Sequence, residues 1–359
     1  MPEINTNAED TIVMHSLDQT VLSRAESDPY RVFMIDGIRS LTFSELEQLS
    51  RARAIHFAKL GARIGTHIAV VGSNTLESVV AICAVLRTGA TVDMLAGETS
   101  AAELRSELTQ REPLAVIAPQ PTLDALREEV ARVGSDHRQW IPIPLDARFD
   151  RARGFPFQEL AGVTAATDVS SIAAGARARS VAIHTASLHG DAVHPSVELA
   201  HGVVTRCAHE FADTLELDAH DVISLALPIT RIDGFLALFA AIGAGSKVVL
   251  ERACAHPYEL LRRIEIYQST VLPTDAAMLA RIIALLPVAS IDVGSVRCVT
   301  IDAMATSTRT ANIPRDQVSA CLAIDVSRFQ ALFSHAKLVW PPLSIVQSAR
   351  SVRELASTR

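Results

Sequence analysis

The chain has 359 residues, of which 49% are hydrophobic and 20% charged, and its formal net charge is −7. This length is typical of about two domains, and the apolar content is enough for a sizeable core, which excludes a wholly disordered chain. The basic residues are scattered and form no Lys/Arg-rich run, so the sequence does not indicate a nucleic-acid partner. The five cysteines are widely spaced without a CxxC pair, which argues against a disulfide framework and against a zinc ribbon.

The N-terminal residues, MPEINTNAED, are polar and acidic and lack the basic and apolar regions of a secretory signal. The longest apolar stretch, residues 235–244, is too short to cross a bilayer. We therefore expect no transmembrane segment and a cytoplasmic location, in which buried cysteines stay reduced.

The N-terminal third of the sequence predicts a hairpin followed by alternating helices and strands. Asp36-Gly37 between two short apolar runs is a strong hairpin signal. Thr42 or Ser44 can cap the helix that follows, and Gly61 ends it. In chain order the predicted elements are a helix within 15–30, strands at 31–35 and 38–43, a helix from 44 to 60, a strand at 67–71, a helix at 76–87, a strand at 90–95, a helix at 101–110 and a strand at 114–118.

Residues 120–180 alternate weak helix with loop, and Pro142, Pro144, Gly154 and Pro156 indicate a linker-like stretch there. A second alternating series follows, with strands at 180–184, 221–226, 246–250, 269–272 and 296–301 and helices at 197–215, 234–244, 257–267 and 275–286. The pattern predicts an α/β protein of two doubly wound subdomains of mostly parallel sheet flanked by helices. We expect the ligand space in the cleft at the carboxyl ends of the strands. The predicted division is a first subdomain at 12–160, a second at 161–305 and an irregular tail at 306–359.

Several stretches carry a resemblance to a known family. The first contains Thr42, Phe43, Glu45, Leu46, Leu60, Gly61, Gly65, Ile68, Ala69, Asn74, Gly89 and Ala90 at characteristic spacings. A strand with a Leu-Pro segment follows within 221–250, and a strand–Pro–helix stretch within 270–283. In this order they resemble the adenylate-forming (AMP-binding) superfamily of acyl-CoA synthetases, fatty-acyl-AMP ligases and peptide-synthetase adenylation domains, over roughly residues 15–303.

The resemblance implies an enzyme that uses ATP and magnesium to activate a carboxylic acid, such as a fatty acid, as an acyl-adenylate. The acyl group then passes to coenzyme A or to an acyl carrier protein. It also implies that this chain lacks the family's third subdomain and C-terminal domain, and that it is a truncated N-terminal domain. The apolar face left uncovered would then favour an oligomer or a partner subunit.

The family's phosphate loop reads Thr-Ser-Gly-Thr-Thr-Gly-x-Pro-Lys-Gly, in which backbone N–H groups and the lysine hold the ATP phosphates. The corresponding stretch here is Thr-Ala-Ser-Leu-His-Gly, so Thr185, Ser187 and Gly190 are the implied nucleotide-binding candidates. The central glycine is replaced by a bulkier residue, no lysine follows, and Asp191 adds a negative charge. Leu-Ala-His201 resembles the family's Leu-Ser/Thr-His after the loop and supports this alignment.

Two acidic residues are candidates for the substrate pocket. Asp233 stands in the Leu-Pro segment, where the family often carries a histidine, and the alternative is that it caps the next helix. Asp302 falls in the place of a Gly-Gly turn, and both glycines are missing. The family's Tyr-Gly-x-Thr-Glu motif has no counterpart, because Tyr267 is the last tyrosine. No catalytic residue is assigned.

Two functions therefore stay open. The chain is either an adenylate-forming ligase with impaired or lost catalysis, or a non-catalytic pseudoenzyme that binds an acyl group, a carrier protein or a partner subunit. The histidines between 184 and 220 lack HExxH spacing, so no metal site is expected. The sequence contains neither a Gly-x-Ser-x-Gly elbow nor a Gly-x-Gly-x-x-Gly turn after a strand. It therefore indicates neither a hydrolase of that kind nor a dinucleotide oxidoreductase.

Overall fold

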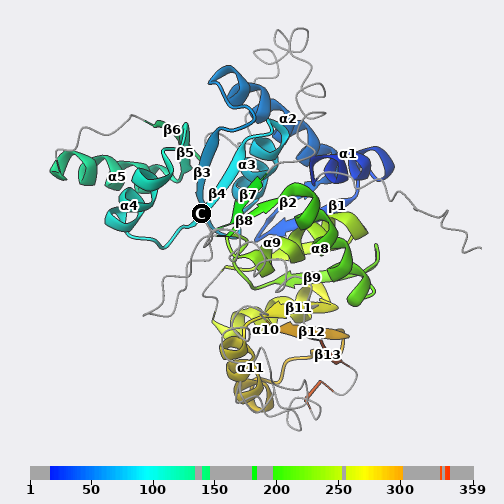
Figure 1. Ribbon diagram of the computed structural model, residues 1–359. Coiled ribbons are helices and arrows are strands. Elements are labelled where there is room, and N and C mark those ends of the chain that lie inside the picture. Colours follow the sequence, from blue (N-terminus) through cyan, green and yellow to red (C-terminus); the bar gives the residue numbers. More distant parts are fainter. Residues whose placement is uncertain are drawn as a thin grey trace, which may run out of the picture.

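The computed structural model describes residues 17–133, 140–145, 180–183, 197–252, 256–301, 332–333 and 336–339 (Figure 1). Its strands are β1 (Val32–Asp36), β2 (Arg39–Thr42), β3 (His67–Gly72), β4 (Thr91–Ala96), β5 (Ala115–Ala118), β6 (Ile141–Pro144), β7 (Ser180–Ile183), β8 (Val197–Ala200), β9 (Val222–Leu225), β10 (Lys247–Leu250), β11 (Val271–Thr274), β12 (Cys298–Ile301) and β13 (Lys337–Val339). Its helices are α1 (Leu17–Ser27), α2 (Phe43–Lys59), α3 (Leu76–Arg87), α4 (Ala101–Arg111), α5 (Gln120–Val133), α8 (His201–Thr214), α9 (Ile232–Ala244), α10 (Pro257–Tyr267) and α11 (Ala276–Ala289).

The strands form two sheets, which we call sheet A and sheet B. Sheet A has seven strands in the order β13-β12-β11-β9-β10-β1-β2, and sheet B has six in the order β6-β5-β3-β4-β7-β8. All neighbouring strands are parallel except the hairpin pairs β1/β2 and β7/β8. The predicted α/β class with mostly parallel sheets flanked by helices is confirmed.

Each sheet contains strands from two separate parts of the chain. The early hairpin β1/β2 belongs to sheet A, in which Met34 of β1 pairs with Val248 of β10. The later hairpin β7/β8 belongs to sheet B, in which Met94 of β4 pairs with Ile183 of β7. The predicted boundary at 160/161 lies outside the described residues, and each sheet takes strands from both sides of it.

The predicted linker-like stretch is wrong at Pro142 and Pro144, which lie in β6, a parallel edge strand of sheet B. The weak helix expected after residue 120 is α5, at residues 120–133. Ile141 and Leu145 donate their backbone N–H groups to the β5 side. The prolines occupy the alternate positions, whose N–H groups would point away from the sheet, so an edge strand accepts them. Gly154 and Pro156 lie outside the described residues.

The helix predicted at 197–215 begins later. Residues 197–200 form β8, which pairs antiparallel with β7 through Ile183 and Val197, and α8 begins at His201. Local periodicity did not separate the strand from the helix, because β8 depends on a partner strand for its hydrogen bonds. The hairpin at Asp36-Gly37 and the cap at Thr42 are confirmed, and Thr42 and Glu45 form a capping box.

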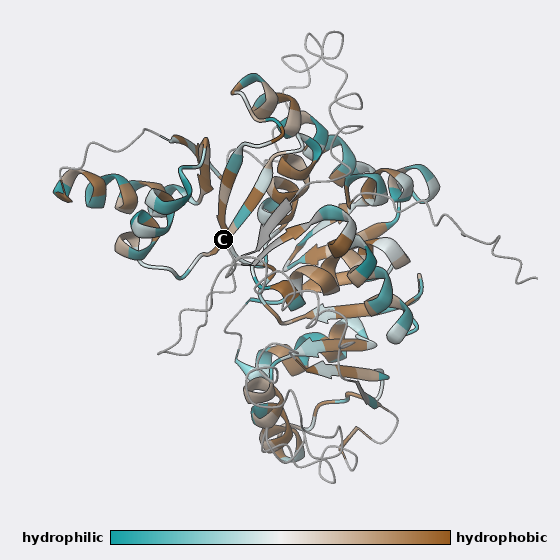
Figure 2. Cartoon of the chain, viewed as in Figure 1, coloured by the Kyte–Doolittle hydropathy of each residue, from teal (hydrophilic) through white to brown (hydrophobic). Residues whose placement is uncertain are grey.

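Helix α9 lies in the main core and is buried along residues 232–242. One hydrophobic cluster joins α9 and α3 to side chains from both sheets, among them Val70 and Met94 of sheet B and Ile223 and Val248 of sheet A. In Figure 2 most residues of α9 have the colour of hydrophobic residues, whereas hydrophobic and hydrophilic residues alternate along α4 and α5. In the described part of the chain, no helix is both long and apolar enough to span a membrane.

Arg297, directly before β12, forms hydrogen bonds to the segment between α8 and β9. Its Nε and Nη2 atoms donate to the two carboxylate oxygens of Asp221 at 2.8 and 2.7 Å, and its Nη1 atom donates to the carbonyl of Leu215 at 2.9 Å. Thr270 donates to the same carboxylate at 2.6 Å. Burial alone would raise the pKa of Asp221, but these hydrogen bonds and the one from the Asp218 N–H outweigh it and hold the pKa below its usual value.

Asp221→Asn should lower the free energy of unfolding by about 1.5–3 kcal/mol, because it removes hydrogen bonds to a charged acceptor. A carboxyl with a depressed pKa stabilises the fold above its unfolded pKa of about 4, and the wild type should lose this stability as the pH falls below that value. Urea titrations at pH 7 and pH 3.5 measure both effects. The control is Glu216→Gln, whose ion pair with Lys337 is 75% exposed on both sides, and it should change stability by less than about 0.5 kcal/mol. Equal effects of the two substitutions would contradict a structural role for the Asp221 carboxylate.

Candidate functional site

The described part of the candidate site lies where the carboxyl end of β3 meets the turn between β9 and α9. Asn74 follows β3 and is only 2% exposed. Its Nδ2 atom donates to the carbonyls of Leu225 and Leu227 at 3.0 and 2.9 Å, and its Oδ1 atom accepts the N–H of Ile229 at 2.9 Å. One side chain of sheet B thus fixes the turn of sheet A by three hydrogen bonds. We call residues 225–229 the Asn74-bound turn.

Gly234 lets this turn pack directly against the first turn of α9. A Cβ atom at Gly234 would lie 2.2 Å from the carbonyl oxygen of Pro228 and 2.9 Å from that of Leu227. Both contacts are with backbone atoms, which cannot move aside as a flexible side chain can. A glycine at position 234 is therefore a steric requirement of this packing.

Asp233 is 3% exposed in the first turn of α9. The alternative prediction that it caps the helix is wrong, because Arg231 is the N-cap and the helix begins at Ile232. An acidic side chain in this turn still interacts favourably with the helix dipole. The sequence analysis assigned the family's histidine position to Asp233, but in a Leu-Pro-x-x-His-x-x-Gly pattern that ends at Gly234 this position falls on Arg231. The role of Asp233 in a substrate pocket stays a prediction.

The hairpin β7/β8 places the ends of the predicted phosphate loop at the same edge. Because β7 runs parallel to β4 and β3, its last residue, Ile183, lies at the carboxyl edge of sheet B, the edge from which Asn74 extends. Thr185, Ser187 and Gly190 lie between β7 and β8 but outside the described residues. Asp302 directly follows β12 and is also outside them. The structure thus describes the frame that carries these candidates.

His201, the first residue of α8 after this hairpin, is buried, with 1% exposure. Neither ring nitrogen has a hydrogen-bond partner in the described part of the chain. Burial lowers its pKa, and the carboxylate of Asp18 opposes this shift only in part. The imidazole is therefore uncharged near neutral pH, and it does not replace the positive charge of the missing phosphate-loop lysine.

Glu251, directly after β10, is a buried carboxylate that the sequence analysis did not single out. It is 1% exposed, lies 2.6 Å from the Nε atom of Arg263 of α10, and accepts a hydrogen bond from Ser224 at 3.3 Å. Burial raises its pKa to about 7, although the guanidinium of Arg263 opposes the rise. Its only sequence signal is an acidic residue at the end of an apolar strand. Burial therefore accounts for the raised pKa, and the ion pair with Arg263 gives this carboxylate a structural role without a catalytic one.

Within the described ranges, no group of three or more His, Cys, Asp or Glu side chains is arranged to hold a metal ion. The cysteines described, Cys83, Cys207 and Cys298, are buried and unbridged. Burial raises the pKa of Cys83 to about 12 and that of Cys298 to about 11, so neither thiol is a nucleophile at neutral pH.

Gly234→Ala should destabilise the protein by more than about 2 kcal/mol, because the added methyl group overlaps backbone oxygens. Gly202→Ala in α8 is the matched control, since nothing lies within 4 Å of its Cβ position, and it should be neutral or stabilising by up to about 1 kcal/mol. Chemical denaturation of both variants compares them. Similar stabilities would show that the Asn74-bound turn is not held against α9 as described.

Glu251 should make stability fall as the pH rises. Its pKa is about 7 in the fold and about 4.5 in the unfolded chain, so its contribution is complete below pH 4.5 and is lost as the pH rises through 7. The slope from this group cannot exceed about 1.4 kcal/mol per pH unit. Unfolding curves between pH 5 and 8 should show a flatter dependence in Glu251→Gln than in the wild type. Glu259→Gln, on the exposed start of α10, should leave the slope unchanged; a wild-type slope in Glu251→Gln would mean that another group titrates.

Comparison with known proteins finds a family model that matches the N-terminal part of the chain. Residues 21–165 match the family model described as AMP-binding enzyme. A curated relative, 2-succinylbenzoate–CoA ligase of Bacillus licheniformis, is 26% identical over 269 residues, which are 73% of this chain and 50% of that protein. Nonribosomal peptide synthetase 1 of Ajellomyces capsulatus is 29% identical over 89 residues, 25% of this chain and 5% of that protein. The chain thus spans about half the length of the ligase and only 5% of the synthetase.

Solved structures agree on the fold. A long-chain-fatty-acid-CoA ligase (FadD1) of Archaeoglobus fulgidus superposes with a TM-score of 0.68 at 15% identity, covering 93% of this chain and 68% of that one. VinN superposes with a TM-score of 0.66 at 18% identity, covering 91% of this chain and 74% of that one. The resemblance predicted from the sequence is confirmed: the chain is similar to AMP-binding enzymes and has the fold of acyl-CoA ligases.

Proposed function

We propose that this protein is an acyl-adenylate-forming ligase homologue in which ATP-dependent activation of a carboxylic acid is strongly impaired or lost. The observation that carries this proposal is the sequence between β7 and β8. The described strands on either side of this stretch pair with each other, and β7 ends at the carboxyl edge of sheet B. The sequence of the stretch has no lysine and contains Asp191. A triphosphate that approaches such a loop meets a negative charge where the relatives present a positive one.

The neighbouring described groups support the same conclusion. His201 is buried and uncharged near neutral pH, so it supplies no compensating charge. Arg231 is the N-cap residue of α9, and a basic residue at this position suits the carboxylate of an acid substrate better than Asp233 does. In this proposal the acid-binding half of the site is retained more fully than the phosphate-binding half.

If a nucleotide binds, Thr185, Ser187 and Gly190 are the residues that would hold its phosphates, and magnesium would neutralise part of the phosphate charge. ATP would supply the adenylyl group that activates the acid. The chain's own contribution would be orientation, by the loop hydroxyls and by the Asn74-bound turn. Coenzyme A or a carrier protein would be the acceptor. The alternative is a non-catalytic module that still binds an acyl group, a carrier protein or a partner subunit.

Calorimetric titration with ATP and magnesium tests the proposal. We expect dissociation in the millimolar range or weaker and no acid-dependent exchange of pyrophosphate into ATP. Tight binding with measurable exchange would contradict impaired catalysis. In that case Thr185→Ala with Ser187→Ala should weaken binding, whereas Ser106→Ala with Thr109→Ala, an exposed pair on α4, should not.

A gain-of-function variant tests the electrostatic argument directly. Counted along the family loop, its lysine corresponds to Val193, so Asp191→Ala with Val193→Lys restores the missing charge pattern. The double variant should bind ATP at least about tenfold more tightly than the wild type, because a charge-assisted hydrogen bond replaces a repulsion. Unchanged affinity in a folded double variant would show that charge is not what limits nucleotide binding.

A further inference from the structure

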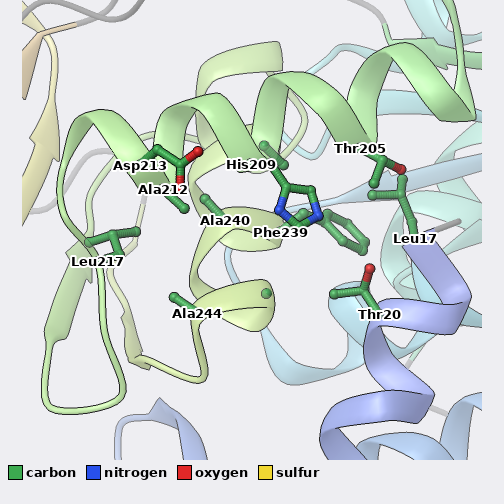
Figure 3. A pocket seen from close by; sticks show the side chains of 12 residues that line it. Leu17, Thr20, Thr205, His209, Ala212, Asp213, Leu217, Phe239, Ala240 and Ala244 are labelled. Carbon is green, nitrogen blue, oxygen red and sulfur yellow. The ribbon is translucent and has the colours of Figure 1, made fainter. Parts of the chain in front are cut away.

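A pocket outside the candidate functional site lies between α1, α8 and α9 (Figure 3) and has a volume of about 140 Å³. Phe239 and Ala240 of α9 form its floor, with Leu17 of α1 and Ala208 of α8 at its sides. Each of these four side chains is at most 4% exposed, so they belong to the packed core. The apolar part of the pocket is therefore preformed, because a close-packed core holds its side chains in place.

The mouth of the pocket is polar. His209 and Asp213 lie one helical turn apart on α8, and both are exposed lining residues. Figure 3 shows the His209 ring extending from α8 toward Thr20 of α1, with Asp213 farther along the same rim. Apolar walls that end in a few polar groups are typical of small-molecule sites.

The rim carries an acidic charge. Asp213 forms no ion pair with another residue of the described ranges. Arg24 of α1 donates instead to the carbonyl of Gly243 at 3.0 Å and lies 3.8 Å from Asp28. Helix α9 brings no basic residue to this region, since its sequence is IDGFLALFAAIGA. A ligand that enters the pocket therefore meets an apolar floor and a polar rim, in which Asp213 is the one acidic lining residue.

We propose that this pocket binds a small organic cation that has a compact aromatic or aliphatic body and one ammonium or amidinium group. The body displaces water from Phe239 and Ala240, and the cation forms a charge-assisted hydrogen bond with Asp213. The volume suits a single ring, since an engineered cavity of about 150 Å³ in another protein holds benzene. The pocket is separate from the proposed adenylation site. It is lined by the C-terminal half of α9, whereas the Asn74-bound turn packs against the N-terminal turn of the same helix.

Ligand-observed NMR and calorimetry on the full chain test this proposal with benzylammonium, benzyl alcohol and benzoate, which share one ring and differ in the head group. Benzylammonium should bind in the millimolar range or tighter, and at least about tenfold more tightly than the other two. Asp213→Asn should remove this preference. Glu210→Gln, on the same helix but not lining the pocket, should keep it.

A filling variant locates the site. Ala212 lines the pocket from the partly exposed rim of α8, so Ala212→Leu should abolish binding without overpacking the core. Ala125→Leu, on the exposed face of α5, is the matched control and should bind as the wild type does; melting curves verify that both fold.

Three outcomes would overturn the proposal. The first is no binding of benzylammonium to the folded wild type. The second is equal binding of the three head groups or binding that survives Ala212→Leu. The third is a dimer in sedimentation that Ala212→Leu disperses, which would mean that a second copy of the chain covers the pocket.

Discussion

The amide of Asn74 holds the two sheets in one relative position. Its side chain extends from the end of β3 and satisfies two carbonyls and one N–H group of the turn that leads into α9. In a buried position, loss of this amide would leave the Leu227 carbonyl and the Ile229 N–H without these partners, each at a cost of about 1–3 kcal/mol. The Leu225 carbonyl would keep its second hydrogen bond, from the Glu251 N–H at 3.1 Å. The start of α9, and with it the described half of the candidate site, depends on this contact. Gly234 completes the arrangement because only a residue without a side chain fits under the Pro228 carbonyl.

Local signals in the sequence predicted the elements well, and long-range pairings limited what else could be predicted. The Asp36-Gly37 turn and the Thr42 capping box are encoded by neighbouring residues, so both were found. Strands β6 and β8 were missed because their hydrogen bonds come from strands elsewhere in the chain. The spacing of motifs identified Asn74 as a family position, but not its three partners. Glu251 and the α1–α8–α9 pocket carried no motif at all, since their surroundings are assembled from distant segments.

A fold and the chemistry performed on it can depend on different residues. In the described part of the chain, the core, the Asn74-bound turn and the Asp221–Arg297 pair hold the frame. The same architecture is found in solved structures at 15–20% identity, so the fold tolerates extensive sequence change. A shared fold is consequently weak evidence for a shared reaction, and the function proposed above rests instead on the charges in the sequence of the predicted phosphate loop.

The exchange of strands between the sheets also has a consequence for synthesis. The β1/β2 hairpin leaves the ribosome early, but its partner β10 is made only after all of sheet B has been translated, since Met34 pairs with Val248. Until then the edge of β1 that pairs with β10 has no partner strand. Unpaired strand edges of this kind are prone to aggregation, and contacts of high sequence separation form slowly. The nascent chain should therefore depend on chaperones until residue 250 has emerged.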